Sequence, residues 1–154
     1  KLDGKGDNIQ DNKEKIEQVI SNGDAYKKFL QLVENQGGDI SYIENTEKFT
    51  KAKYKMPVEA VKTGYVQKLN AEDVGKIAMH LGAGRMKKED NIDYAVGIEL
   101  LKKVGCHVEQ GEIIAYIYAE DEQKGREAVE KLQQTYEIGE QNVEKVADII
   151  EIIE

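Results

Sequence analysis

The sequence has one cysteine and one proline among its 154 residues, and its purely apolar runs are short. A single cysteine, Cys106, cannot form a disulfide within the chain, and such usage is typical of a reducing, cytoplasmic setting. A membrane-spanning helix takes about 20 mostly apolar residues, so we predict no membrane span. Residues 1–12 are polar and lack the apolar centre of a secretory signal. We therefore expect a cytoplasmic protein.

The balance of charged and apolar residues predicts a folded domain that does not bind nucleic acid. Charged residues make up 34% of the sequence and apolar residues 40%, which suits a folded chain better than a disordered one. The formal net charge is -8, whereas surfaces that bind phosphate backbones concentrate Lys and Arg on one face. The length allows one main core, with at most a small helical appendage.

The first part of the chain predicts two short helices. The first is expected to follow Asn12 and to stop at Gly23. Asp24 is the candidate N-cap of the second, which Gly37 and Gly38 close. Two short helices bury little by themselves, so we expect their apolar faces to cover something else, and we favour a part outside this sequence. Residues 40–54 are polar and irregular and are interpreted as a linker.

The second part alternates strand and helix signals. From Met56 to Leu69, two short β-type runs around Thr63-Gly64 predict a hairpin. Asn70 then opens a helix that ends at Gly82. A second β region covers 95–117, with a turn between Gly105 and Gly111, and a helix is predicted over 121–134. The last residues, from Val143 on, suit either a helix or a buried strand over 148–153.

Two sets of motifs resemble known families. Gly64-Tyr-Val and Gly105-Cys-His-Val-Glu-Gln-Gly111-Glu-Ile-Ile resemble the half-motifs of biotinyl and lipoyl domains, in which glycines turn tight corners and apolar residues fill a small barrel. The second set of motifs extends over nearly the whole chain and, in its order and spacing, is similar to the C-terminal part of the pyrimidine-nucleoside phosphorylase and thymidine phosphorylase family. It consists of Ser21-Asn-Gly-Asp-Ala-Tyr-Lys-Lys-Phe29, Gln36-Gly-Gly-Asp39, Gly64-Tyr-Val66, Leu81-Gly-Ala-Gly-Arg85, Lys87-Lys-Glu-Asp90, Ile92-Asp93, Val96-Gly-Ile98 and Lys102-Lys103.

The resemblance implies a fold, a function and partners. It implies an α+β fold, with a barrel-sandwich hybrid (α/β-hammerhead-like) C-terminal domain over 46–154 preceded by two short helices. Residues 1–45 would be the terminal helices of a preceding α/β domain and the linker. Family members are homodimeric, bacterial nucleoside-salvage enzymes that convert thymidine or uridine and phosphate to base and pentose 1-phosphate. The implied partners are the rest of the enzyme chain, phosphate and nucleoside.

The same resemblance implies that this chain has no catalytic residue and no cofactor or metal site of its own. The family's phosphate loop, a Lys-His-Ser-Thr-Gly-Gly-type segment, and its base-binding residues lie upstream in the family chain. The expected role here is a wall of the cleft that moves in domain closure. Candidate contacts for closure follow the predicted helix end and are Gly82, Gly84, Arg85, Lys87 and Lys88. The alternative is that the two glycines only end a helix and reverse the chain, while the charges form a solvated face.

Three further side chains have simpler explanations. Cys106 and His107 are neighbours in a predicted strand, so they point to opposite faces and make a poor catalytic pair. His80 has no residue at metal-ligand spacing and is interpreted as structural. A carrier domain with a lipoyl- or biotinyl-modified Lys124 is the competing hypothesis. It requires Lys124 on a β-turn, whereas the residues that follow have helical spacing.

Overall fold

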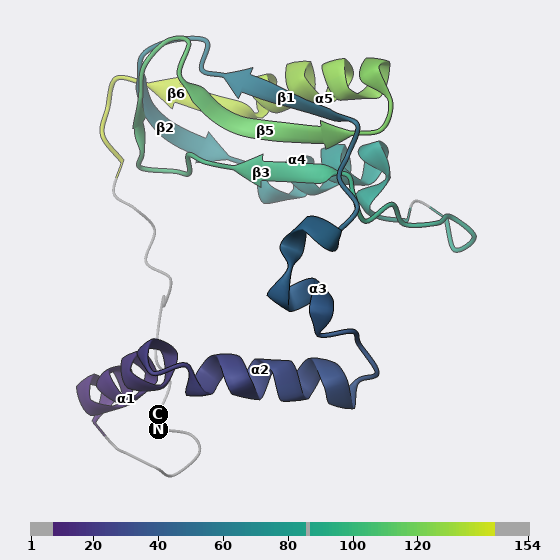
Figure 1. Ribbon diagram of the computed structural model, residues 1–154. Coiled ribbons are helices and arrows are strands. Elements are labelled where there is room, and N and C mark those ends of the chain that lie inside the picture. Colours follow the sequence, from purple (N-terminus) through teal and green to yellow (C-terminus); the bar gives the residue numbers. More distant parts are fainter. Residues whose placement is uncertain (1–7, 86, 144–154) are drawn as a thin grey trace. The chain divides into compact units, whose positions relative to one another are not determined.

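The computed structural model describes residues 8–85 and 87–143 (Figure 1). The chain divides into two compact units, Lys1–Phe49 and Thr50–Glu154. The predicted C-terminal helix or strand beyond Val143 lies outside the described residues. None of the described helices is long and apolar enough to cross a membrane.

The first unit contains α1 (Ile9–Ser21), α2 (Asp24–Asn35), α3 (Ser41–Glu44) and the 3-10 turn η1 (Thr46–Lys48). The two predicted helices are present and end just before the predicted glycines, but the predicted start after Asn12 and the predicted cap at Asp24 are wrong. Asn8 caps α1 by accepting a hydrogen bond from the Gln10 amide, so the helix starts before Asn12. Gly23, in the left-handed conformation, precedes α2, and Asp24 is its first residue. The predicted linker contains α3 and η1 instead of being irregular throughout.

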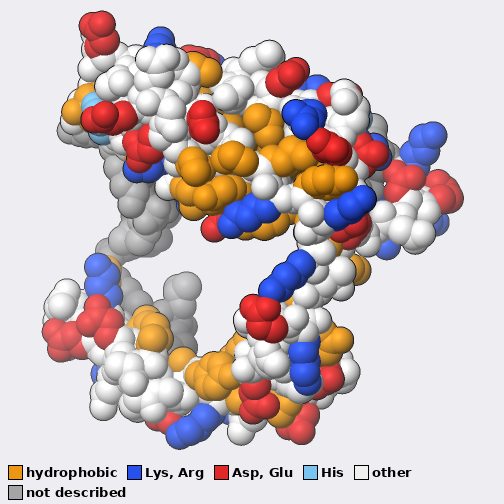
Figure 2. All heavy atoms as spheres, turned by 45° about the horizontal axis from the view of Figure 1, so that its top comes forward, with side chains coloured by type: hydrophobic (Ala, Val, Ile, Leu, Met, Phe, Trp, Pro, Cys, Tyr) orange, Lys and Arg blue, Asp and Glu red, His pale blue; other side chains and the backbone are white. Residues whose placement is uncertain are grey.

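The helices of this unit bury no residue. Ile16 is 57% exposed, Ile20 63% and Leu32 56%, and hydrophobic side chains are visible on this unit in the lower part of Figure 2. Amphipathic helices are stable mainly when their apolar faces are covered. Within the described residues, these faces remain uncovered.

In the part of the second unit that the structure describes, there are two three-stranded antiparallel sheets and two main helices. The first sheet has the order β1 (Tyr54–Glu59), β5 (Ile113–Ala119), β3 (Gly97–Leu100), and the second has the order β4 (His107–Val108), β2 (Gly64–Leu69), β6 (Tyr136–Gly139). The predicted hairpin is wrong, because β1 pairs with β5 whereas β2 pairs with β4 and β6. The segment around Thr63 therefore connects two sheets. Strand β6 was not predicted, because its four residues follow a helix without a turn signal.

The turn predicted between Gly105 and Gly111 is confirmed only in part, because each glycine lies in a turn of its own and the short strand β4 lies between them. Gly105 and Gly111 both have positive φ, at 89° and 83°, and they flank β4. Glycine adopts this conformation at little cost because it has no Cβ. The chain can therefore turn sharply on both sides of the short β4.

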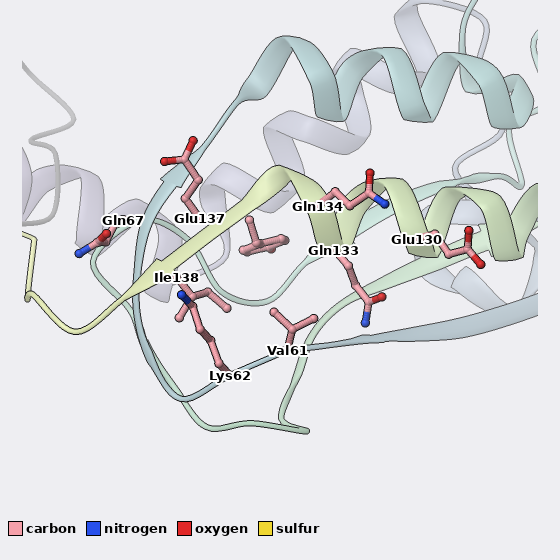
Figure 3. A pocket seen from close by; sticks show the side chains of 9 residues that line it. Val61, Lys62, Gln67, Glu130, Gln133, Gln134, Glu137 and Ile138 are labelled. Carbon is pink, nitrogen blue, oxygen red and sulfur yellow. The ribbon is translucent and has the colours of Figure 1, made fainter.

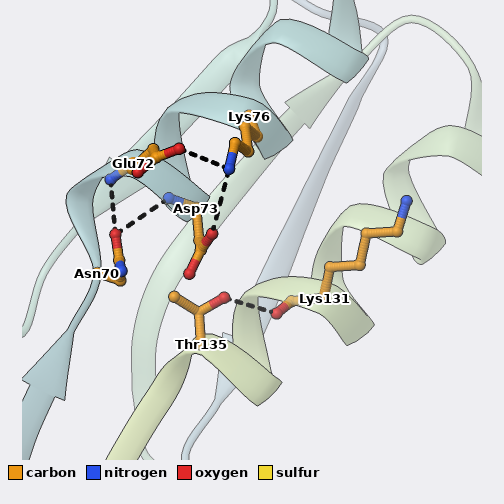
Figure 4. A network of polar contacts seen from close by, with 6 residues as sticks. All are labelled: Asn70, Glu72, Asp73, Lys76, Lys131 and Thr135. Atoms are coloured by element: carbon orange, nitrogen blue, oxygen red, sulfur yellow. Dashed lines mark hydrogen bonds and ion pairs between the residues drawn. The ribbon is translucent and has the colours of Figure 1, made fainter.

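The two main helices are α4 (Ala71–Ala78) and α5 (Glu122–Thr135). The predicted cap of α4 is confirmed: Asn70 Oδ1 accepts hydrogen bonds from the amides of Glu72 and Asp73 (Figure 4). Asp121 caps α5 in the same way, through the Lys124 amide. Ala128 and Leu132 of α5 are buried in a core to which side chains of both sheets contribute.

Candidate functional site

The predicted candidate site begins where α4 ends in a π-helical turn, η2 (Met79–Ala83). Gly82 has φ 113°, which ends the helix, as the sequence predicts. Its carbonyl oxygen accepts a hydrogen bond of 2.9 Å from the backbone amide of Asp93. Leu81 and Val96, on either side of this contact, are both buried. The segment between Gly82 and Asp93, of which the structure describes residues 83–85 and 87–92, is called the cationic loop.

The cationic loop leaves the second unit as a projection that is visible in Figure 1. Gly84 has extended backbone angles and lies against Met79, whose Cγ would be 3.2 Å from an added Cβ. In the middle of the loop, the Lys87 amide donates to Asp90 Oδ2 at 2.9 Å, and the Asp90 amide donates to the Lys87 carbonyl at 3.1 Å. The described parts of the loop are thus held by local hydrogen bonds.

The three predicted cations are exposed. Among residues 8–85 and 87–143, the side chains of Arg85, Lys87 and Lys88 have no ion pair or hydrogen bond. Their charges are therefore available to an anionic ligand or to carboxylates of another domain. The structure places these three residues in one loop, where their side chains are exposed.

A hollow next to the cationic loop was not anticipated from the sequence. It has a volume of about 370 Å³ and is lined by Thr50, Asn91, Ile92, Asp93, Tyr94 and Ala95. Tyr94 is 90% exposed, so its ring is open to contact by another molecule or domain. Of the residues that line this hollow, Ile92 and Asp93 are part of the motif set that resembles the phosphorylase family.

A larger hollow lies at α5 and β6. It has a volume of about 580 Å³ and is lined mainly by polar side chains, shown in Figure 3. Gln133 points toward Val61 and donates to the Glu59 carbonyl, whereas Gln134 projects away from Val61. Because these polar groups do not converge, the hollow has no arrangement suited to catalysis.

The histidines and the cysteine have structural surroundings. His107 packs edge-on against Tyr65 with ring centroids 4.9 Å apart, and Cys106 is half-buried. His80 Nε2 lies 3.8 Å from Glu127 Oε2 of α5, a partner that the sequence did not reveal. Over the part of the chain that the structure describes, no group of three or more His, Cys, Asp or Glu residues is placed to hold a metal ion.

Lys124 lies on a helix. Its backbone amide donates to Asp121 Oδ1 at 2.8 Å, within the first turn of α5. A carrier domain needs its modified lysine at the tip of a β-turn. The competing hypothesis therefore has no support in this geometry.

These features define an α+β domain with two small antiparallel sheets and an exposed loop that carries three cations. The family model described as "Pyrimidine nucleoside phosphorylase C-terminal domain" matches residues 65–139. The chain belongs to this family.

Curated relatives extend the similarity to most of the chain. The pyrimidine-nucleoside phosphorylase of Bacillus subtilis (strain 168) is 45% identical over 118 residues, which are 77% of this chain and 27% of the relative. The pyrimidine-nucleoside phosphorylases of Staphylococcus aureus strains USA300 and NCTC 8325 / PS 47 are each 38% identical over 139 residues, 90% of this chain and 32% of the relative. The chain thus spans roughly 27–32% of the length of these relatives.

Proposed function

We propose that this chain acts as the C-terminal part of a longer pyrimidine-nucleoside phosphorylase, which cleaves thymidine or uridine with phosphate to give free base and pentose 1-phosphate. The observation that carries the proposal is the similarity of up to 90% of the chain to proteins that bear this name. The chain itself contributes no catalytic residue and no cofactor. Phosphate and nucleoside are bound by the remainder of the longer chain, which forms a homodimer.

The uncovered faces of α1 and α2 support a division into two domains. In this proposal, residues 1–45 are the last helices and the linker of the preceding α/β domain, and residues 46–154 are the C-terminal domain. Apolar side chains such as Ile16, Ile20 and Leu32 would then be buried by the rest of that domain. The partner of the first unit is therefore the same enzyme chain.

We assign the second unit to the barrel-sandwich hybrid of this family. Support comes from its core, to which Val58 and Ile117 of one sheet and Val66, Val108 and Ile138 of the other contribute. Two sheets that share one core form a compact body, which can move as a unit.

The role proposed for the second unit is a wall of the active-site cleft. In the closed enzyme, Gly82, Gly84, Arg85, Lys87 and Lys88 approach the α/β domain, and the three cations meet carboxylates or substrate phosphate there. Closure excludes water from the reacting groups and holds phosphate and nucleoside in position. The exposure of all three cations is what supports this role.

The test is phosphate-dependent release of free base, measured with thymidine, uridine and deoxyuridine. A longer protein that includes this chain together with an upstream phosphorylase segment is expected to release base only when phosphate is present. The 154-residue chain alone is expected to release none. Base release by the isolated chain, or none by the longer protein, would refute the proposal.

A further inference from the structure

Asp93 is joined to both sides of the base of the cationic loop. Its backbone amide donates to the Gly82 carbonyl at 2.9 Å, and its carboxylate Oδ1 accepts from the Ala95 amide at 2.9 Å. The first bond closes the loop, and the second turns the chain toward Val96 and β3. We call this pair of hydrogen bonds the Asp93 clasp.

The clasp lies at the edge of the core. Leu81 precedes Gly82 and is 7% exposed, while Val96 follows Ala95 and is 8% exposed. An added Cβ on Gly82 would lie 3.7 Å from Asp93 Cβ and from Val96 Cγ2, so the two arms of the loop are in close contact. Buried, well-packed residues move little. The clasp therefore fixes the loop to a rigid base.

We infer that Asp93 is a positioning residue that sets the direction in which the cationic loop presents Arg85, Lys87 and Lys88. The inference rests on the proposed function, because it assumes that these cations act when the cleft closes. Asp93 does not itself contact substrate. Its side chain holds the Ala95 amide in a tight turn, and this turn orients the Asp93 backbone amide toward the Gly82 carbonyl. The cations therefore start from one geometry, and little conformational entropy is lost on closure.

Only the bond from the Ala95 amide depends on the Asp93 side chain, because the bond to the Gly82 carbonyl is made by the Asp93 backbone amide. Asp93→Ala removes the acceptor of the Ala95 amide, whereas Asp93→Asn retains a side-chain oxygen at the same position. Because the side-chain bond of the clasp needs an acceptor and not a negative charge, the Asn variant is expected to restore what the Ala variant loses. Asp90→Ala is the matched control, since it removes the acceptor of the Lys87 amide and leaves the clasp intact.

Amide hydrogen exchange in the 154-residue chain tests the clasp independently of enzyme activity. In Asp93→Ala, exchange of the Ala95 amide is expected to be about tenfold faster, as for the loss of one hydrogen bond to a charged acceptor. In Asp93→Asn it stays within about threefold of the wild type. Asp90→Ala accelerates exchange at Lys87 but not at Ala95. An unchanged Ala95 rate in Asp93→Ala overturns the clasp.

Kinetics of the longer phosphorylase test the positioning role. Asp93→Ala is expected to lower kcat/KM about fivefold, mainly through KM, with recovery in Asp93→Asn, because misplaced cations weaken binding more than chemistry. Arg85→Glu is measured beside them. If Arg85→Glu lowers kcat/KM but Asp93→Ala does not, positioning is refuted while the cleft role stands. If Arg85→Glu also has no effect, the cleft role of the loop fails, and positioning fails with it even where the exchange data establish the clasp.

Discussion

The Tyr136 hydroxyl, at the start of β6, donates a hydrogen bond of 2.9 Å to the carbonyl oxygen of Lys102. The same hydroxyl lies 3.4 Å from the carbonyl oxygen of Ile114 in β5. Tyr136 is buried, and β6 belongs to the second sheet whereas β5 belongs to the first. This side chain therefore joins the backbones of the two sheets.

Removal of this hydroxyl is expected to destabilise the domain. Tyr136→Phe should lower the free energy of unfolding by about 1–2 kcal/mol, because a part-buried carbonyl loses its partner while the ring still fills its space. Urea unfolding followed by circular dichroism measures the change. Tyr94→Phe is the control, since Tyr94 is 90% exposed and should change stability by less than about 0.5 kcal/mol. Equal stabilities of the two variants would contradict the account.

The same tyrosine predicts a loss of stability at high pH. Burial, with a smaller effect of the nearby Cys106, raises the pKa of Tyr136 from about 10 to about 12. The folded state thus holds the proton more tightly than the unfolded state, so this contribution is complete below about pH 10 and is lost as the pH rises toward about 12. The advantage of wild type over Tyr136→Phe should shrink across that window, by at most about 2–3 kcal/mol. An advantage that stays constant between about pH 9 and pH 11.5 would show that Tyr136 ionises normally.

Two glycine-to-alanine substitutions should have opposite effects. At Gly64, φ is 153° and an added Cβ would lie 2.6 Å from the Gly139 carbonyl oxygen, so Gly64→Ala should cost about 3 kcal/mol or more. Gly75 lies in α4 with nothing within 4 Å of an added Cβ. Gly75→Ala should therefore stabilise the protein by about 0.5–1 kcal/mol through helix propensity. Thermal unfolding of both variants tests the sheet contact, and a Gly64→Ala protein as stable as wild type would argue against it.

The core should respond to a cavity at Leu132. This residue of α5 is fully buried, so Leu132→Ala should lower the free energy of unfolding by about 2–5 kcal/mol. The comparison is Leu101→Ala, which truncates a leucine that is 45% exposed and should cost much less. Urea midpoints of both variants measure the difference. Similar losses would place α5 outside the core.

Local sequence signals predicted local structure well. The side chain of Asn70 satisfies helix amides within three residues, and Gly105 and Gly111 turn the chain within a few residues, so these features could be predicted without knowledge of distant partners. The pairing of β1 with β5 joins residues roughly sixty apart in sequence. No short-range pattern indicates a pairing between residues so far apart in the sequence. The two neighbouring runs around Thr63 therefore predict a hairpin that the structure does not contain.

The candidate site was predictable in composition but not in geometry. The glycines and cations between Gly82 and Lys88 were visible in the sequence, and Gly82 ends the helix as predicted. The role of Asp93 depends on a hydrogen bond to a residue eleven positions earlier, which only the fold reveals. His80 was likewise predicted to be structural, but its contact with Glu127 needed α5 to be placed.

The measurement that tests the central claim most directly is the kcat/KM for phosphorolysis in the longer phosphorylase carrying Arg85→Glu. Lys62→Glu is the matched control, since Lys62 is an exposed lysine of the same unit outside the cationic loop. If the cationic loop contacts the α/β domain or substrate, charge reversal at Arg85 should lower kcat/KM about tenfold, equivalent to about 1.4 kcal/mol, while Lys62→Glu stays close to wild type. Equal values for both variants and wild type would contradict the account.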